Sequence, residues 1–288
     1  MEIGLHFMNF SVEGGADAIP DAFAAAAIAA DEHGLDRLTV MDHWFQMERF
    51  APATEPMLEA YTALGFAAGL TKRIKLGALV TGVTYRWPAL LVKTATTLDV
   101  LSRGRSFFGI GAAWYEREHV GLGVPYPPIA ERFQRLEELI EIAQQMWSQD
   151  DGPFAGEFTT LAETICRPAP PRGRIPILIG GGGERKTLRL VARYADEANL
   201  FADEPEVLAH KLDVLRGHCA DVGRDPDEIR ITVLAGGDPV ADPIAFVERM
   251  KPLADLGATQ VQVRNPTSKV AEWVARLGEE VVPKLGSL

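Results

Sequence analysis

The feature that most constrains this 288-residue chain is a regular alternation of strand-like and helix-like segments. Short apolar runs predict eight strands, at residues 3–7, 37–41, 74–80, 106–110, 177–179, 197–201, 229–234 and 260–263. Helical patterns follow them, at residues 22–33, 57–70, 89–101, 129–149, 184–194, 205–222, 244–256 and 268–282. Such alternation implies parallel pairing of strands that are buried on both faces. We therefore predict an α/β fold, a (β/α)8 TIM barrel, with a doubly wound open sheet as the alternative.

One interruption breaks the alternation, at residues 151–174, before the fifth strand. It contains the sequence FAGEFTT, which predicts a small hairpin, and then a proline-rich return to the barrel. No linker or low-complexity tract divides the chain. We expect a single domain over residues 1–288.

Charge and cysteine content exclude several classes of partner. The net charge of −11 leaves no basic stripe for nucleic acid or for an anionic membrane. The two cysteines, Cys166 and Cys219, form neither a disulfide framework nor a zinc knuckle. No apolar run approaches the roughly 18 residues of a membrane span, and the N-terminal residues begin a strand rather than a targeting signal. These features predict a cytoplasmic protein with no membrane partner.

Four consecutive glycines, Gly180 to Gly183, follow the fifth strand and precede a helical pattern. Backbone N–H groups left uncovered at the start of a helix form a site for a phosphate. A flexible strand-to-helix turn is the alternative for one or two glycines. Four in a row favour the close approach of a ligand, and we expect that ligand to be a cofactor.

In a barrel of this type the active site lies at the C-terminal ends of the strands. Small and polar residues follow several predicted strands, as a planar cofactor in a cleft requires. The residues that we expect to contact this cofactor at the ends of the first four strands are His6, Asn9, Asp42, Thr81, Gly82 and Gly111.

His43 follows the second strand directly and is the first candidate for catalysis. An imidazole with a pKa near 6.5 donates or accepts a proton at neutral pH. The alternative is a structural histidine bonded to a backbone carbonyl, with Asp42 capping a turn.

Glu116 lies close to the predicted mouth of the barrel and is the second candidate acid or base. It begins an E-x-x-H pattern with His119, but such a pattern builds a di-iron site only in paired copies on bundle helices. We expect no metal site, and we expect Glu118 and His119 to lie in a salt-bridging turn on the surface. The glycine run also lacks the G-x-G-x-x-G spacing of a Rossmann nucleotide site.

Several segments together resemble the bacterial luciferase-like monooxygenase superfamily, and most closely its branch of deazaflavin-dependent oxidoreductases, which use coenzyme F420. The segments that carry the resemblance are residues 40–43 (VMDH), 57–61 (MLEAY), 76–88 (LGALVTGVTYRWP), 98–105 (LDVLSRGR), 109–119 (GIGAAWYEREH), 125–132 (PYPPIAER) and 176–183 (PILIGGGG). They occur in order over essentially the whole chain.

The resemblance implies a luciferase-type TIM barrel with an insertion before the fifth strand, where residues 151–174 fall. It also implies a flavin-like ring in the barrel mouth, backed by a cis peptide bond near Leu79 and Val80. The glycine run matches the segment that binds the ribityl phosphate, so Gly181, Gly182 and Gly183 are expected phosphate ligands. Arg185 or Lys186 is expected to meet the phosphate or the acidic tail of a deazaflavin.

His43 matches the histidine that sugar-phosphate dehydrogenases of this branch use as a base. The chain departs from those enzymes at one position, because they place a glutamate after the glycine motif of the fourth strand where this chain has Trp114. The resemblance therefore does not support a sugar-phosphate substrate, and Trp114 is expected to wall an apolar substrate pocket or simply to pack.

The leading hypothesis is an oxidoreductase that transfers a hydride between a deazaflavin and a small organic substrate, with His43, or less readily Glu116, moving the proton. A second hypothesis exchanges the deazaflavin for FMN and gives an oxygen-using monooxygenase. A third is a non-catalytic protein that binds the cofactor. The resemblance also implies a homodimer.

Overall fold

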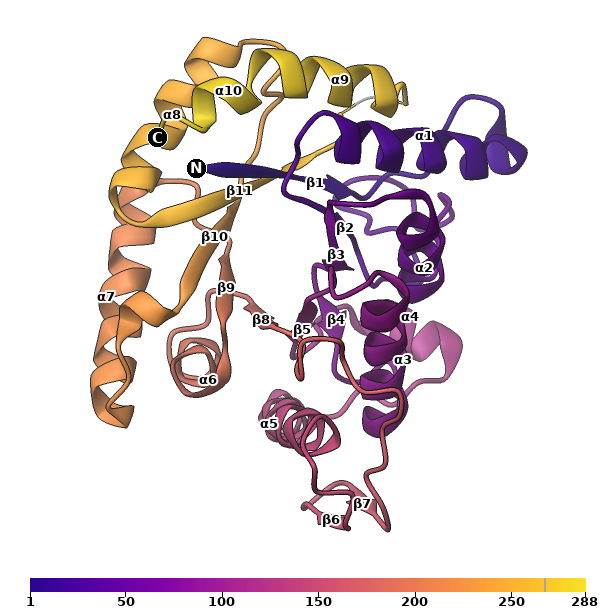
Figure 1. Ribbon diagram of the computed structural model, residues 1–288, viewed down its shortest axis with the longest axis vertical. Coiled ribbons are helices and arrows are strands. Elements are labelled where there is room, and N and C mark those ends of the chain that lie inside the picture. Colours follow the sequence, from indigo (N-terminus) through magenta and orange to yellow (C-terminus); the bar gives the residue numbers. More distant parts are fainter. Residues whose placement is uncertain (267) are drawn as a thin grey trace.

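A ring of parallel strands with helices around its outside makes up the molecule (Figure 1). The computed structural model describes residues 1–266 and 268–288. The strands of the ring are β1 (Glu2–Phe7), β2 (Arg37–Val40), β3 (Lys75–Ala78), β4 (Thr81–Gly82), β5 (Phe108–Gly111), β8 (Ile177–Gly180), β9 (Glu197–Leu200), β10 (Arg230–Leu234) and β11 (Ala258–Arg264). The helices are α1 (Ile19–Glu32), α2 (Ala60–Leu70), α3 (Pro88–Leu101), α4 (Glu116–Leu122), α5 (Ile129–Met146), α6 (Thr187–Tyr194), α7 (Pro205–Val222), α8 (Pro243–Asp255), α9 (Val270–Glu280) and α10 (Val282–Leu285).

The order of the strands confirms the predicted barrel. Hydrogen bonds connect them in the order β3-β2-β1-β11-β10-β9-β8-β5-β4, and every pair in this sheet is parallel. Backbone hydrogen bonds from Leu76 of β3 to Arg105 and Phe107 join the two ends of the sheet. The alternative of a doubly wound open sheet is therefore wrong.

The third strand of the barrel is interrupted where the resemblance implies a bulge. The bond between Leu79 and Val80 is a cis peptide, which confirms that expectation. It separates β3, which pairs with β2, from β4, which pairs with β5.

Two segments outside the ring differ from a plain barrel. In the insertion at residues 151–174, β6 (Phe154–Ala155) pairs antiparallel with β7 (Thr160–Leu161), and this short hairpin projects below the barrel in Figure 1. The connection after β5 contains α4, a helix that the sequence analysis did not anticipate. The helix after the glycine run begins at Thr187 rather than at residue 184, because residues 184–186 form a turn.

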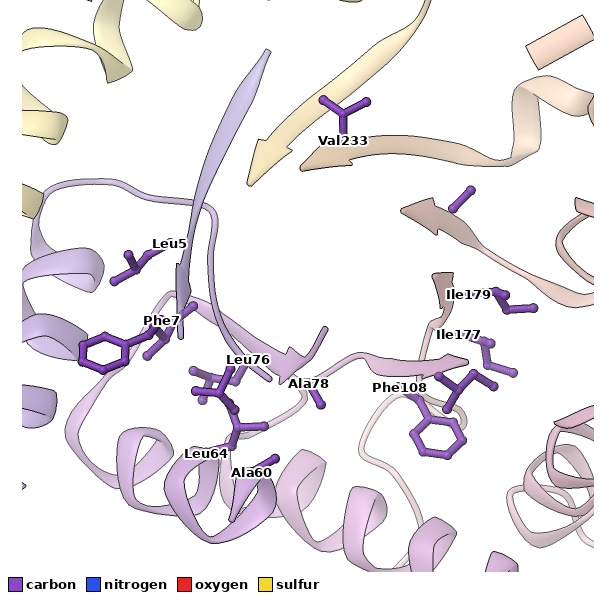
Figure 2. Close-up of a cluster of buried hydrophobic side chains, with 14 of the residues drawn as sticks. Leu5, Phe7, Ala60, Leu64, Leu76, Ala78, Phe108, Ile177, Ile179 and Val233 are labelled. Atoms are coloured by element: carbon purple, nitrogen blue, oxygen red, sulfur yellow. The ribbon is translucent and has the colours of Figure 1, made fainter. Parts of the chain in front are cut away.

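Alternate residues of the strands point outward and build the main core beneath the helices. Figure 2 shows Leu5 and Phe7 of β1, Leu76 and Ala78 of β3, and other strand residues directed toward the surrounding helices. All four of these side chains are buried. Removing such large apolar surfaces from water supplies the main stabilisation of the barrel.

The strands are buried on both faces, as predicted, but several of the residues that face the barrel interior are polar. Arg37 of β2 donates to Glu197 of β9 at 2.9 Å, and these strands are not neighbours, so the contact crosses the barrel interior. Asn199 of β9 donates to Thr232 of β10 at 2.9 Å. The outward-facing residues of these same strands are apolar, and for this reason each strand is hydrophobic when averaged over its sequence.

No helix in the described part of the chain has both the length and the apolar character to cross a membrane.

Candidate active site

The predicted site residues lie at one end of the barrel, where the strands terminate. His6 lies near the C-terminal end of β1, Asp42 and His43 follow β2, and Gly111 is the last residue of β5. The glycine run follows β8. Strand order places β8 across the ring from β1, the neighbour of β2, so the glycine run and His43 lie on different sides of the mouth.

His43 is held by a buried carboxylate. Its Nδ1 lies 2.7 Å from Oε1 of Glu118, whose side chain is fully buried in α4. An ionised carboxylate can only accept a hydrogen bond. The Nδ1 atom of neutral His43 therefore carries the proton and donates a hydrogen bond to Glu118. In the part of the chain that the structure describes, Nε2 makes no hydrogen bond. The Nε2 atom of the neutral imidazole therefore carries a lone pair that is free to accept a proton.

Glu118 is itself fixed by three further donors. The backbone N–H groups of Trp44 and Phe45 donate to Oε2 at 2.8 and 3.2 Å, and the hydroxyl of Tyr85 donates to Oε1. Burial by itself would raise the pKa of Glu118. The hydrogen bond and charge of His43, together with the other donors, outweigh burial, so the pKa of Glu118 is lowered overall. Burial, and then the bond to Glu118, raises the pKa of Tyr85, so this hydroxyl stays protonated. The carboxylate is ionised and cannot turn away from His43.

The structure corrects the expectation for residues 116–119. Glu118 and His119 were expected in a surface turn, and both are wholly buried. His119 accepts or donates through both ring nitrogens, to the carbonyl of Tyr115 and to Thr84, each at 2.7 Å. Glu116 is exposed at the first turn of α4 and makes no contact with His43 among the described residues. The geometry favours Glu118 over Glu116 as the acidic partner.

Aromatic rings surround the free side of His43. The ring of Trp114 lies 5.5 Å from the imidazole and stacks on Tyr115 at 5.2 Å. Trp114 is 54 % exposed although it is large and apolar. Its backbone carbonyl accepts from Tyr126 at 2.8 Å, and Arg132 donates to the carbonyl of Ala113 at 2.6 Å. These bonds hold an apolar indole face at the mouth.

Asp42 is committed to an ion pair. Both of its oxygens bind Arg86, at 2.6 and 2.8 Å, and Arg86 also contacts Glu59. Burial raises the pKa of Asp42, and the bonds from Arg86 oppose that rise only in part. Asp42 therefore anchors the segment that carries His43, and it has little capacity left for a cofactor.

His6 and Asn9 stand at the end of β1. The Nδ1 atom of His6 lies 2.8 Å from the hydroxyl of Thr39, and the ring is buried. Burial lowers the pKa of His6 to about 3, with smaller contributions from the charges of Arg264 and His43. His6 is thus neutral at physiological pH. Asn9 is exposed and its side chain accepts the N–H of Ser11 in a local turn.

Val80, which follows the cis peptide bond, packs against glycines at the ends of neighbouring strands. A Cβ atom at Gly111 would lie 2.9 Å from Cγ2 of Val80, and one at Gly180 would lie 2.8 Å from Cγ1. Next to it, Thr81 is buried and bonds to the hydroxyl of Tyr61 at 2.9 Å. A Cβ at Gly82 would meet the ring of Tyr85 at 2.8 Å. Glycines at these strand ends are needed so that the bulge fits into the barrel mouth.

The glycine run leaves donors free beside a cation. Gly181 has a φ of +120°, a conformation that glycine adopts readily, and its N–H bonds to Asn199. No hydrogen bond from the N–H groups of Gly182 or Gly183 occurs within the described residues. A Cβ on Gly182 would lie 3.7 Å from Cε of Lys211 on α7.

Lys211 is a residue that the sequence analysis missed. Its ammonium pairs with Glu184 at 2.5 Å, directly after the glycine run. Arg185, the predicted cation, is exposed and has no hydrogen bond in the described chain, and Lys186 stacks on Phe133. Lys211 comes from the next helix, 28 to 31 positions beyond the glycines of the run, so the local sequence gave no signal for it.

Asn199 adds an unpartnered acceptor at the same place. Its backbone carbonyl binds Gly181 and its amide nitrogen binds Thr232, but its buried Oδ1 atom has no partner among the residues that the structure describes. Buried acceptors are normally satisfied. An orphaned acceptor on the strand residue whose backbone binds Gly181 fits a ligand that carries hydroxyl groups as well as a phosphate.

Among residues 1–266 and 268–288, no three histidine, cysteine or carboxylate side chains converge as a metal site.

Comparison with known proteins gives this geometry a family. The family model described as luciferase-like monooxygenase matches residues 1–242. An uncharacterized protein of Mycobacterium tuberculosis is 30 % identical over 282 residues, covering 91 % of this chain and 93 % of that protein. The F420-dependent glucose-6-phosphate dehydrogenase of Kineococcus radiotolerans is 34 % identical over 185 residues, but the match covers 62 % of this chain and only 50 % of the dehydrogenase. The enzyme of the same name from Amycolatopsis mediterranei is 27 % identical over 325 residues, with coverage of 91 % and 93 %.

Solved structures share the fold at low identity. An F420-dependent secondary alcohol dehydrogenase, in complex with an F420–acetone adduct, superposes with a TM-score of 0.81 at 18 % identity and covers 99 % of this chain and 98 % of its own. The oxygenating component of 3,6-diketocamphane monooxygenase from Pseudomonas putida, in complex with FMN, gives a TM-score of 0.75 at 16 % identity with 99 % of both chains covered.

Proposed function

The chain belongs to the luciferase-like monooxygenase family, and from that premise we propose that it is an oxidoreductase that transfers a hydride between a deazaflavin coenzyme of the F420 type and a small organic substrate. The observation that carries this proposal is the pairing of His43 with Glu118 across the barrel mouth from the glycine run. A proton-transfer group and a phosphate-binding segment then face the same space.

The residues present fit a phosphate-bearing coenzyme. Gly182 and Gly183 offer free N–H groups, Lys211 offers a positive charge, and Oδ1 of Asn199 offers an acceptor for a ribityl hydroxyl. Val80 presents its backbone and side chain at the mouth, where it would back a flat ring. When bound, a reduced deazaflavin supplies a hydride, and the protein supplies position and proton transfer.

His43 manages the proton that accompanies the hydride. With Nδ1–H donated to Glu118, its Nε2 takes the proton of a substrate hydroxyl during oxidation. In the reverse direction, the protonated ring gives that proton to a carbonyl oxygen. Glu118 stabilises the positive imidazolium and keeps its plane fixed, as a buried carboxylate does for a catalytic histidine in other folds. Trp114 provides the apolar wall against which the substrate packs.

Relatives support the choice of deazaflavin. Dehydrogenases named for F420 dependence reach 35 % identity over 62 % of this chain, whereas F420 and FMN enzymes both occur among structures that share only the fold. The fold alone therefore does not select the coenzyme. An oxygen-using FMN monooxygenase is the second candidate, since an FMN-bound enzyme covers 99 % of the chain.

A binding titration separates the two candidates. The purified protein is titrated with oxidised deazaflavin coenzyme and, separately, with FMN, while coenzyme fluorescence is followed. We expect the deazaflavin to bind more tightly. Tight binding of FMN with no binding of deazaflavin would replace this proposal with the monooxygenase.

A variant tests the assignment of the phosphate site. Lys211→Gln should weaken binding of the phosphorylated coenzyme about tenfold, because a charge-assisted hydrogen bond contributes roughly 1.5–3 kcal/mol. A deazaflavin without its phosphate should bind the variant and the parent protein equally. Arg216→Gln, an exposed change on the same helix, is the control. Equal losses for both forms of the coenzyme would mean that Lys211 acts on the fold rather than on phosphate.

We also propose that residues 1–288 act as one domain, that the chain forms a homodimer, and that it works in the cytoplasm on a small molecule. Light scattering on a size-exclusion column tests the dimer. A protein that binds the coenzyme but reduces or oxidises none of a broad panel of alcohols, ketones and enones would instead be a non-catalytic carrier.

A further inference from the structure

Within the described residues, two arginines at the barrel mouth form no ion pair with an acidic side chain. Arg49 lies in the loop after β2, and Arg264 is the last residue of β11. Their guanidinium carbons lie 4.7 and 5.2 Å from the centre of the ring of Phe50, so one aromatic side chain gathers both. Neither makes a hydrogen bond or ion pair in the part of the chain that the structure describes.

This lack of partners is not a lack of acids, since the chain has 40 acidic and 29 basic residues. Three carboxylates near the barrel mouth are engaged with other partners. Glu48 contacts Tyr115 and Arg117, and Glu118 is bound to His43. Asp203 accepts the N–H of Gly236 at 3.2 Å, and it acts on Arg264 only through its field.

Arg264 is partly buried, and its neighbours oppose its charge. Burial lowers the pKa of Arg264, the like charge of Arg49 lowers it further, and Asp203 partly offsets both. The charge of Arg264 also contributes to lowering the pKa of His6. Two cations held close together repel each other, and an anion bound between them relieves the repulsion that the field of Asp203 leaves.

We propose that Arg49 and Arg264 recognise an anionic group, a carboxylate or a phosphate, on the substrate whose reacting carbon lies beside His43. This inference rests on the proposed function for the placement of the reacting carbon. Arg264 ends β11 and His43 follows β2, and these strands flank β1 on either side. The forked guanidinium binds either oxyanion with two parallel hydrogen bonds.

The position across the ring separates this site from the coenzyme phosphate. The glycine run follows β8, which lies opposite β1, so a phosphate held there is on the far side of the mouth. Phe50 beside the arginines and Trp114 beside His43 leave apolar faces exposed, with 40 % and 54 % of their surfaces accessible. The substrate class is therefore an organic acid or phosphate ester with an apolar body.

The test is a calorimetric titration of the coenzyme-loaded protein with benzoate, with inorganic phosphate and with benzamide. Benzamide has nearly the shape of benzoate but carries no charge. We expect benzoate or phosphate to bind and benzamide to bind at least about tenfold more weakly. Equal affinity for benzoate and benzamide would overturn the proposal, as would failure of both anions to bind. Binding of benzoate alone assigns the site to carboxylates, and binding of phosphate alone assigns it to phosphate esters.

Variants locate the effect. Arg264→Gln and Arg49→Gln should each weaken the anion about tenfold and leave the affinity for the deazaflavin unchanged. Arg216→Gln, an exposed arginine on α7 paired with Asp213, is the matched control and should change neither. Anion binding that survives both substitutions overturns the site. An equal loss of coenzyme binding also overturns it, because the arginines would then hold the coenzyme.

The two proposals can fail separately. If the protein binds no deazaflavin, the same titration is carried out on the protein alone. Loss of benzoate or phosphate binding in Arg264→Gln then supports the anion site while the proposed function falls.

Discussion

The barrel carries a charged network at each end, and the two networks are built differently. At the N-terminal ends of the strands, Arg37 binds Asp36 and Glu197, and Lys75 also binds Asp36. At the C-terminal ends, His43 has a partner on one nitrogen only, and Arg49 and Arg264 have no acidic partner within the described residues. Charges at the first end bind one another, whereas at the second end His43, Arg49 and Arg264 leave positions open for a ligand.

The difference also appears in how each end uses its neutral side chains. Phe107 lies at the N-terminal end of the barrel, where the guanidinium carbon of Arg37 is 4.8 Å from the centre of its ring. A Cβ atom on Gly77 would lie 2.5 Å from this ring. At the mouth, Trp114 and Phe50 leave large apolar faces in contact with water. One end is packed for stability, and the other is prepared for binding.

The largest effect is expected at the closed end. Arg37→Leu should lower the free energy of unfolding by about 3–5 kcal/mol, because Asp36 and Glu197 would lose the cation buried between them. Urea unfolding measures this, with Arg216→Leu as the surface control, expected to cost less than about 1 kcal/mol. A loss below about 1 kcal/mol for Arg37→Leu would show that this network is not structural.

At the open end, His43→Ala should lower turnover by about 10²-fold and leave unfolding and coenzyme affinity nearly unchanged. The reason is that the imidazole moves a proton but fills little of the core. Steady-state kinetics with an acceptor found by screening gives the result. Full activity in this variant would remove His43 from the mechanism.

Glu118→Gln should lower turnover about tenfold, since the amide no longer stabilises a positive imidazole. The acid limb of the pH–rate profile should also move to lower pH, a change that a purely structural defect would not produce. Glu116→Gln is the matched control two residues away and should change turnover less than about twofold. If Glu116→Gln proved the more damaging substitution, the roles given to the two glutamates would be reversed.

The smallest effect concerns His6, between the two ends. Its pKa is about 3 in the folded protein and about 6.5 when unfolded, so the unfolded chain binds more protons in that interval. Stability is therefore lost as pH falls through 6.5 toward 3. Between pH 7 and pH 6 the loss due to His6 should be about 0.5–1 kcal/mol, and His6→Gln should remove it. Identical pH dependence of unfolding in the two proteins would show that His6 is not held neutral.

The architecture could be predicted from the sequence because the local pattern of apolar residues indicates most strands and helices. The order of segments predicted the barrel, and the resemblance of residues 76–88 located the cis bond at Leu79 and Val80. The polar interior was missed because Arg37, Glu197 and Gln260 alternate with buried apolar neighbours, and the alternation was hidden in runs that are apolar on average.

The site was harder to predict because its partners come from distant elements. Glu118 is 75 positions from His43, and α4 was taken for an irregular connection. A signal was nevertheless present, since Tyr115, Glu118 and His119 have the spacing of one helical face and all three are buried. Lys211 and Asn199 gave no comparable signal, because only the closed barrel brings them to the glycine run.

The most direct test of the account is the protonation of His43 itself. Nitrogen-15 NMR of the histidine-labelled protein, with His43 assigned by comparison with a His43→Gln sample, reports which ring nitrogen carries the proton. The account predicts that neutral His43 is protonated at Nδ1 and bare at Nε2, and that Glu118→Gln weakens this preference. A neutral ring protonated at Nε2 would contradict it, because Nε2 would then carry no lone pair that is free to accept a proton.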